Sequence, residues 1–271
     1  MAVRIAGLLG GVLAAWLCAA FCQAAGLTVI TTLEEGTPQQ AAADVEQAVQ
    51  AINRTMQQVY AWEAERTVTL CLTPNRLKYQ NALQRQFAMP ESEALYLSQR
   101  TAGWTAGRFV VTNVEGVSSS SARKRHFIHE LTHQYVYSLV DEAQAAELLW
   151  LSEGLAEVVA FQASGADGPE VWRQTLRVAP VLPYLSQLRR PGLWRRTAEV
   201  YGTPVCYAMS ALAVWRLEEN AGAGALRKYY QQLRAKPDKI SGFANATGSD
   251  LLVFEDDFER WLAEESLRRS K

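Results

Sequence analysis

The sequence has few histidines and few cysteines, and it has no excess of either charge. Its 271 residues include three histidines and four cysteines, and 27 Lys and Arg are balanced by 28 Asp and Glu. A near-neutral chain is not typical of a protein whose main partner is a nucleic acid, because such proteins usually carry a net positive charge. We therefore expect no nucleic acid among its partners.

The sequence also has no internal repeat and no stretch typical of a linker between independent domains. With 49% hydrophobic residues, a chain of this length can bury a sizeable core. We expect one domain over residues 25–271, and the sequence does not indicate its oligomeric state.

Residues 1–24 have the layout of a secretory signal peptide. A basic start at Arg4 is followed by an apolar run over 5–21, and small residues allow cleavage before Ala25. A retained membrane anchor is the alternative, because the run approaches the length of a spanning helix. The pattern favours an exported protein, periplasmic or secreted, with no stable membrane insertion after cleavage.

Cleavage of this leader would remove Cys18 and Cys22 and leave Cys71 and Cys206. Two cysteines in an oxidising compartment can form one disulfide. The alternative, which their apolar surroundings favour, is that both are buried as unpaired side chains.

The hydrophobic pattern predicts an α+β fold, with a small α/β lobe over 25–117 and a mainly helical lobe over 118–271. In the first lobe, Thr37 is expected to cap a helix that begins at Pro38 and runs to Trp62. A serine among residues 118–121 is expected to cap the helix that follows. The other predicted elements are strands over 27–33, 67–73 and 107–113 and helices over 76–87, 143–162, 203–220, 222–235 and 249–268.

The motif that carries chemistry is HELTH, residues 129–133. On a helix, residues four apart share a face, so His129 and His133 can bind one metal ion while Glu130 addresses a water molecule beside it. The motif is typical of metallohydrolases, and we expect one zinc ion as the cofactor.

A catalytic zinc ion needs a third protein ligand. His126 is the one remaining histidine, but it cannot join His129 and His133 around a tetrahedral metal without distorting the helix, so a capping or surface role is expected for it. Glu153 is the better candidate. It lies 20 residues after His133, which allows the chain to turn and bring a second helix back alongside the first.

The stretch around Glu153, WLSEGLAE over 150–157, resembles the gluzincin metallopeptidases. It is similar to the WLNEG segment of aminopeptidase-N-like members, its spacing from HELTH matches thermolysin-like members, and the whole is similar to peptidase MA-like domains of exported bacterial proteins. The resemblance implies a zincin-like fold, with His129, His133 and Glu153 as zinc ligands and Glu130 as general base.

The same resemblance suggests two supporting residues. Glu157 matches the carboxylate that thermolysin-like enzymes place beside a zinc ligand, and His129 is its expected partner. The segment from Tyr207 to Glu218 is similar to the one that supplies the oxyanion-stabilising tyrosine of aminopeptidase-N-like enzymes. Because no histidine follows His133, Tyr207 is the expected donor, with Tyr201 in reserve.

Together these residues predict hydrolysis of a peptide or protein substrate, with endopeptidase action as the default. The strand over 107–113 is expected to be an edge strand that pairs with an extended peptide, or else an ordinary strand of the sheet. The alternatives are an amidohydrolase acting on a non-peptide amide, a zinc-binding scaffold without catalysis and a helical protein without a metal.

Overall fold

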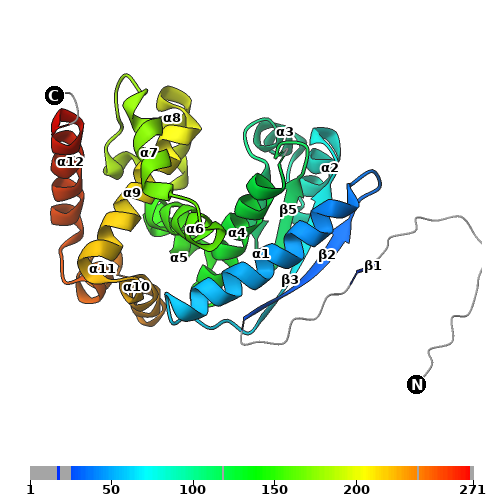
Figure 1. Cartoon of the computed structure of the whole chain (residues 1–271), viewed down its shortest axis with the longest axis horizontal. Helices are drawn as coiled ribbons and strands as arrows, with labels where there is room; N and C mark the ends of the chain where they lie inside the picture. The colour runs from blue at the N-terminus through cyan, green and yellow to red at the C-terminus, as the bar shows by residue number, and fades with distance from the viewer. Residues whose placement is uncertain (1–16, 19–25, 118, 237, 269–271) are drawn as a thin grey trace, which may run out of the picture.

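The protein is described by a computed structural model that covers residues 17–18, 26–117, 119–236 and 238–268 (Figure 1). The predicted leader lies outside these residues except for β1 (Leu17–Cys18), which pairs antiparallel with β2. Among the described residues, no helix is long and apolar enough to span a membrane. Cys71 and Cys206 are both free and buried, as the sequence favoured.

The first part of the chain builds a mixed sheet with helices on both faces. Its strand order is β1-β2-β3-β5-β4, in which β2, β3 and β5 are parallel and β4 is antiparallel to β5. The elements are β2 (Leu27–Leu33), α1 (Gln39–Gln58), β3 (Arg66–Thr73), α2 (Arg76–Phe87), α3 (Glu91–Ser98), β4 (Gly103–Ala106) and β5 (Phe109–Asn113).

The central strand β3 is buried on both faces over its second half, Leu70–Thr73, whereas its first half alternates between buried and more exposed residues. Successive side chains of a strand point to opposite faces. Leu70 and Leu72 therefore enter the main core with α1, whereas Cys71 enters a smaller core with Tyr79 and Leu83 of α2. The sheet is thus covered by α1 and the later helices on one face and by α2 and α3 on the other (Figure 1).

The edge of the sheet differs from the expectation. The predicted strand over 107–113 is β5, and it lies between β3 and β4 rather than at the edge. Gly103–Ala106 forms β4, just before β5 in the chain. Gly107, with a φ of +55°, lets the chain reverse within two residues, so that β5 runs back beside β4. The edge strand is therefore β4, and of the two alternatives for 107–113 the ordinary sheet strand is confirmed and the edge strand was wrong.

The second part of the chain is helical, as predicted, and packs around α4 and α6 (Figure 1). Its core is continuous with the main core of the sheet. The elements are α4 (Ser120–Val136), α5 (Glu142–Ala145), η1 (Ala146–Leu148), α6 (Leu149–Ser164), α7 (Gly168–Arg177), η2 (Leu185–Leu188), α8 (Pro191–Tyr201), α9 (Thr203–Ala221), α10 (Gly224–Ala235), α11 (Lys239–Thr247) and α12 (Leu251–Arg268).

Two local predictions were wrong for tertiary reasons. Thr37 does not cap α1, because its hydroxyl donates to the carbonyl of Leu72 at 3.1 Å. The single helix predicted over 143–162 is divided at η1, where the backbone N–H of Leu149 donates to the carbonyl of Arg189 at 2.8 Å. In both places a partner distant in sequence replaces the local hydrogen bond.

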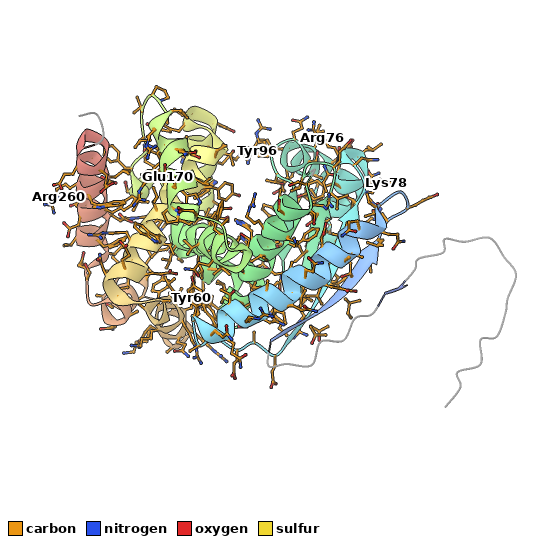
Figure 2. All side chains as sticks on the ribbon, in the orientation of Figure 1. Tyr60, Arg76, Lys78, Tyr96, Glu170 and Arg260 are labelled. Atoms are coloured by element: carbon orange, nitrogen blue, oxygen red, sulfur yellow. The ribbon has the colours of Figure 1, made fainter. Side chains whose placement is uncertain are left out.

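A hydrogen-bonded group of Tyr60, Gln162 and Glu218 joins the residues after α1 to α6 and α9. The Tyr60 hydroxyl donates to Glu218 at 2.6 Å and lies 3.0 Å from the amide oxygen of Gln162, and the Gln162 amide donates to Glu218 at 3.2 Å. Burial raises the pKa of Glu218 to about 7, and the hydrogen bonds from Tyr60 and Gln162 only partly oppose this shift. Figure 2 labels Tyr60 near the end of α1.

This raised pKa predicts a pH-dependent stability. The folded chain binds the Glu218 proton more tightly than the unfolded chain does. The stabilisation of the fold by this proton is therefore complete below about pH 4.5 and is lost as pH rises through about 7. Glu218→Gln should raise the free energy of unfolding at pH 8 by about 1–3 kcal/mol and change it little at pH 5. Urea unfolding at both pH values tests this. Glu219→Gln, at the exposed neighbouring position, is the control. Equal effects of the two variants on the free energy of unfolding would contradict the role assigned to Glu218.

Candidate metal centre

The HELTH motif lies in the buried half of α4. Ser119 caps this helix by accepting a hydrogen bond from the N–H of Ala122 at 3.2 Å, as expected for a serine of the 118–121 run. All residues over 127–136 are buried, because α4 packs between α1 and α6. The two histidines are therefore fixed on a rigid element.

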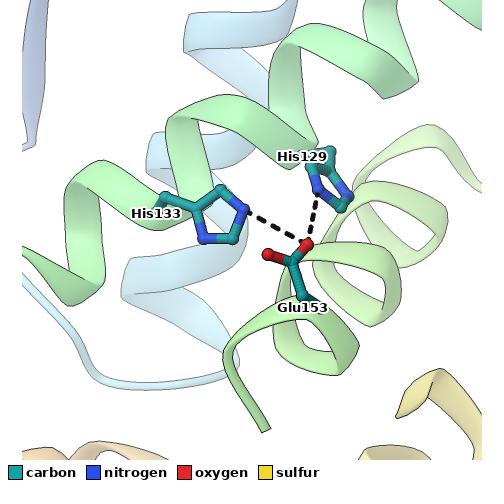
Figure 3. A group of neighbouring side chains, drawn as sticks. All are labelled: His129, His133 and Glu153. Carbon is teal, nitrogen blue, oxygen red and sulfur yellow. Dashed lines mark ion pairs between the residues drawn. The ribbon is translucent and has the colours of Figure 1, made fainter. Parts of the chain in front are cut away.

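The predicted ligands meet in one place (Figure 3). Nε2 of His129 lies 3.4 Å from Oε2 of Glu153, and Nε2 of His133 lies 3.6 Å from the same oxygen. The histidines are one turn apart on α4, and Glu153 reaches them from the second turn of α6, which packs directly against α4.

These three side chains form a group that can hold a metal ion, since their ligand atoms all lie within 4.8 Å of one another. Around a four-coordinate metal with bonds of about 2.0–2.1 Å, ligand atoms are roughly 3.3 Å apart. The distances of 3.4 and 3.6 Å from Glu153 to the two histidines are close to that separation. The site can therefore bind a metal with little rearrangement.

Glu157 lies where the sequence predicted it. Its Oε1 is 2.9 Å from Nδ1 of His129, one turn along α6 from Glu153. Burial alone would lower the pKa of His129, but Glu153 and Glu157 raise it well above its ordinary value. Burial would likewise raise the pKa of Glu153, and the two histidines lower it instead. The two carboxylates thus create an environment that favours a cation.

His133 has partners that the sequence did not reveal. The Ser152 hydroxyl lies 3.3 Å from its Nδ1, on the side away from Glu153, and the Tyr137 ring stacks on the imidazole at 6.3 Å. A hydrogen bond to the far nitrogen fixes the tautomer and orientation of a metal-binding histidine. Ser152 directly precedes Glu153, so this adjacency was the one signal available in the sequence.

The Glu130 side chain contacts the edge strand β4. Thr105 donates to its Oε2 at 2.5 Å, and a Cβ added at Gly103 would lie 2.3 Å from its Oε1. Glu130 is 6% exposed. Its carboxylate is thus held against the strand, and only glycine at position 103 leaves room for it.

This close approach predicts the effect of Gly103→Ala. The new methyl group would displace the Glu130 carboxylate and also meet the His126 ring, both of which can move without unfolding the chain. We expect the hydrolysis that the HELTH motif predicts to fall by about 10–100-fold without loss of the metal, because a predicted base that is displaced by an ångström loses its alignment. Gly192→Ala, where an added Cβ meets no atom within 4 Å, is the matched control. Equal activities of the two variants would contradict this reading.

His126 is not among the three residues of the ligand group, and it lies beside β4, half-buried, instead of capping the helix. Its ring lies against Gly103 and hydrogen-bonds the backbone of Ala102. Burial lowers its pKa below the ordinary value. It is one turn before Glu130 on α4, so it faces the same strand.

Tyr207 also reaches the site. Its ring contacts His129 edge to face at 5.6 Å and Trp194 of α8 at 5.4 Å. Burial, followed by the charges of Glu153, Glu130 and Glu157, raises its pKa well above the ordinary value, so the phenol remains protonated and can donate a hydrogen bond. Trp194 was missed, because no sequence signal connects α8 to the motif.

Tyr201, the reserve donor, is the last residue of α8 and is half-buried against the main core. Within the described part of the chain, no contact joins it to the ligand group. Of the two tyrosines considered, the structure therefore brings only Tyr207 to the metal centre.

Comparison with known proteins adds no family assignment, because no protein-family model and no curated protein matches the chain.

Proposed function

We propose that this chain is an exported zinc-dependent peptidase with a gluzincin-type site. The observation that supports this function best is the meeting of two HELTH histidines with Glu153 of the next long helix. A buried carboxylate, Glu130, and a protonated phenol, Tyr207, flank the same group. Metal ligands, a base and a hydrogen-bond donor are the parts that amide hydrolysis requires.

Zinc is the metal that this donor set favours. Two imidazoles and one carboxylate bind many catalytic zinc ions, which keep a fourth position open. When bound, zinc supplies a Lewis acid that polarises a carbonyl and lowers the pKa of water. His129, His133 and Glu153 would hold it, while Glu157 and Ser152 orient the two imidazoles.

The remaining side chains of the site would move protons and bind charge. Glu130 is proposed to take the proton of the attacking water and to deliver it to the leaving amine. Thr105 orients one Glu130 oxygen through its hydroxyl. Tyr207 is proposed to donate a hydrogen bond to the carbonyl oxygen as negative charge develops there.

The substrate class is proposed from the position of β4. This strand ends the sheet, so among the described residues its edge away from β5 pairs with no other strand. An exposed edge can bind an extended peptide through main-chain hydrogen bonds. Because Gly103 and Thr105 of β4 contact Glu130, a peptide bound along this edge would pass beside the base.

The function is tested by assaying purified zinc-loaded protein on an unstructured protein such as casein and on a diverse peptide library. We expect cleavage that stops when a chelator removes zinc and resumes when zinc is restored. Zinc-loaded, folded protein that cleaves none of these substrates would overturn the proposal in favour of a zinc-binding scaffold or a non-peptide amidohydrolase.

Export is tested separately, by locating the protein in cell fractions and determining its N-terminus. We expect a periplasmic or secreted chain that begins at Ala25. A cytoplasmic chain that retains residues 1–24 would contradict this part of the proposal.

A further inference from the structure

Three side chains join α3 to α8, two helices more than ninety positions apart in the sequence. Figure 2 labels one of them, Tyr96. The Tyr96 hydroxyl of α3 donates to Glu199 of α8 at 3.2 Å. The Arg195 guanidinium lies 4.2 Å from the centre of the Tyr96 ring. Because Arg195 and Glu199 are one helical turn apart, both reach the same ring, and we name Tyr96, Arg195 and Glu199 the Tyr96 clamp.

Both ends of the Tyr96 clamp lead directly to the metal centre. On the α8 side, Trp194 precedes Arg195 and packs on Tyr207, which in turn packs on His129. On the α3 side, the chain leaves α3 after Ser98 and enters β4 at Gly103, against the Glu130 carboxylate. The clamp therefore connects α8, whose Trp194 packs on the expected oxyanion donor Tyr207 of α9, to α3, which precedes the strand that contacts the expected base.

The connection is made by side chains alone. Within the described residues, no backbone hydrogen bond joins α3 to α8. Arg195 and Glu199 are exposed and Tyr96 is half-buried, and at exposed sites cation–π contacts and hydrogen bonds are individually weak. Otherwise α3 packs on α2, and α8 packs on α9 and η2. The clamp can therefore open without disturbing either half of the core.

We propose that Tyr96 selects substrates by length. The inference rests on the proposed peptidase function. A peptide paired with β4 would pass beside Glu130. Because the chain leads from α3 directly into β4 at Gly103, the Tyr96 clamp would bound the path of the peptide at the Gly103 end of the strand. With the clamp closed, only a short stretch of peptide fits at that end. The favoured substrates are therefore short peptides and bonds near a chain end, and internal bonds of a long chain require the clamp to open.

The first test measures the closure itself and needs neither metal nor activity. Spin labels are placed on the chain that begins at Ala25, which lacks Cys18 and Cys22, at the exposed positions Glu91→Cys of α3 and Val200→Cys of α8. The native Cys71 and Cys206 are buried with raised pKa values, that of Cys206 to about 12, so they react slowly with the label.

Electron paramagnetic resonance should give one narrow distance distribution in the labelled parent. Adding Tyr96→Ala should broaden the distribution and shift it to longer distances. Leu95→Ala, which removes an exposed apolar side chain from the same helix, should leave it unchanged and is the control. The same distribution with and without Tyr96→Ala would overturn the inference.

The second test measures length selection. Peptides that share one cleaved sequence are extended by about ten residues on one side or on the other, and kcat/KM is compared between the short and long forms. The wild type should prefer the short form at least tenfold for extension on one side only. Tyr96→Ala should bring that ratio close to one, Tyr96→Phe should give an intermediate value because it keeps the ring, and Leu95→Ala should keep the wild-type ratio.

Failures of the two proposals are distinguishable. Hydrolysis without a length preference that depends on Tyr96 would overturn length selection and leave the peptidase function in place. The other outcome is that the spin labels show a closed clamp but the zinc-loaded protein cleaves no peptide. This result would overturn the peptidase function and, with it, the selection of peptides by length.

Discussion

Glu130→Gln is expected to lower kcat/KM for peptide hydrolysis by about a thousandfold while the protein keeps its metal. The substitution preserves the size of the side chain, and its amide can still pair with the Thr105 hydroxyl. It removes the carboxylate that is proposed to accept the proton, and a positioned general base contributes about 10²–10⁴ in rate. Because Glu130 is not among the metal ligands, metal binding should be unchanged.

The measurement is the rate of peptide hydrolysis and the metal content of the same sample, so that loss of the base is separated from loss of the metal. Glu46→Gln, which makes the same change at an exposed position of α1, is the control. A variant that holds zinc and cleaves at the wild-type rate would remove Glu130 from the mechanism.

Gly154→Ala is expected to destabilise the fold by about 3 kcal/mol or more. On helix propensity alone the change should stabilise α6, since alanine is favoured over glycine by about 1 kcal/mol. The packing decides otherwise, because an added Cβ would lie 2.2 Å from the carbonyl oxygen of Ser210 in α9 and 2.6 Å from the Val214 side chain. Backbone atoms cannot move aside as a side chain can, so α6 and α9 must separate.

The separation would also affect the metal centre, because Glu153 adjoins Gly154 and Tyr207 lies one turn before Ser210. Chemical unfolding followed by circular dichroism measures the change in stability, and Gly224→Ala, where an added Cβ meets no atom within 4 Å, is the control. An unfolding free energy of Gly154→Ala equal to or above that of the wild type would show that the helices are not in contact there.

Elements with local signals were predictable from the sequence. The helix predicted over 76–87 has the observed bounds of α2, because Pro74 ends the strand before it and the Asn75 side chain caps it by accepting from Lys78 at 3.0 Å. The strand predicted over 27–33 likewise matches β2. In both cases the residues that determine the structure are neighbours in the chain.

Elements determined by distant partners were not predictable. The hairpin that makes β4 the edge strand depends on pairing with β5, and the interruption at η1 depends on the contact between Leu149 and Arg189. The helix α8, which brings Trp194 to Tyr207, was not predicted, since most of its side chains are at least partly exposed and leave little apolar pattern.

The residues of the candidate site also fall into those that the sequence predicted and those that it did not. His129, Glu130 and His133 are given by spacing on one helix, and Glu153, Glu157 and Tyr207 by resemblance to gluzincins, and the structure brings them together. The supporting residues were missed. Thr105 and Ser152 act through hydrogen bonds that only the packing of β4 on α4 and of α4 on α6 creates.

The most direct test of the account is the zinc content of the purified protein and of Glu153→Ala after dialysis against a weak chelator. The account predicts about one zinc per chain in the wild type and almost none in Glu153→Ala. A site with three protein ligands loses most of its affinity for zinc when one ligand is removed. Glu157→Gln, one turn away on the same helix, should retain zinc with an affinity weakened about 10–100-fold. A wild type that binds no zinc, or full retention in Glu153→Ala, would contradict the account.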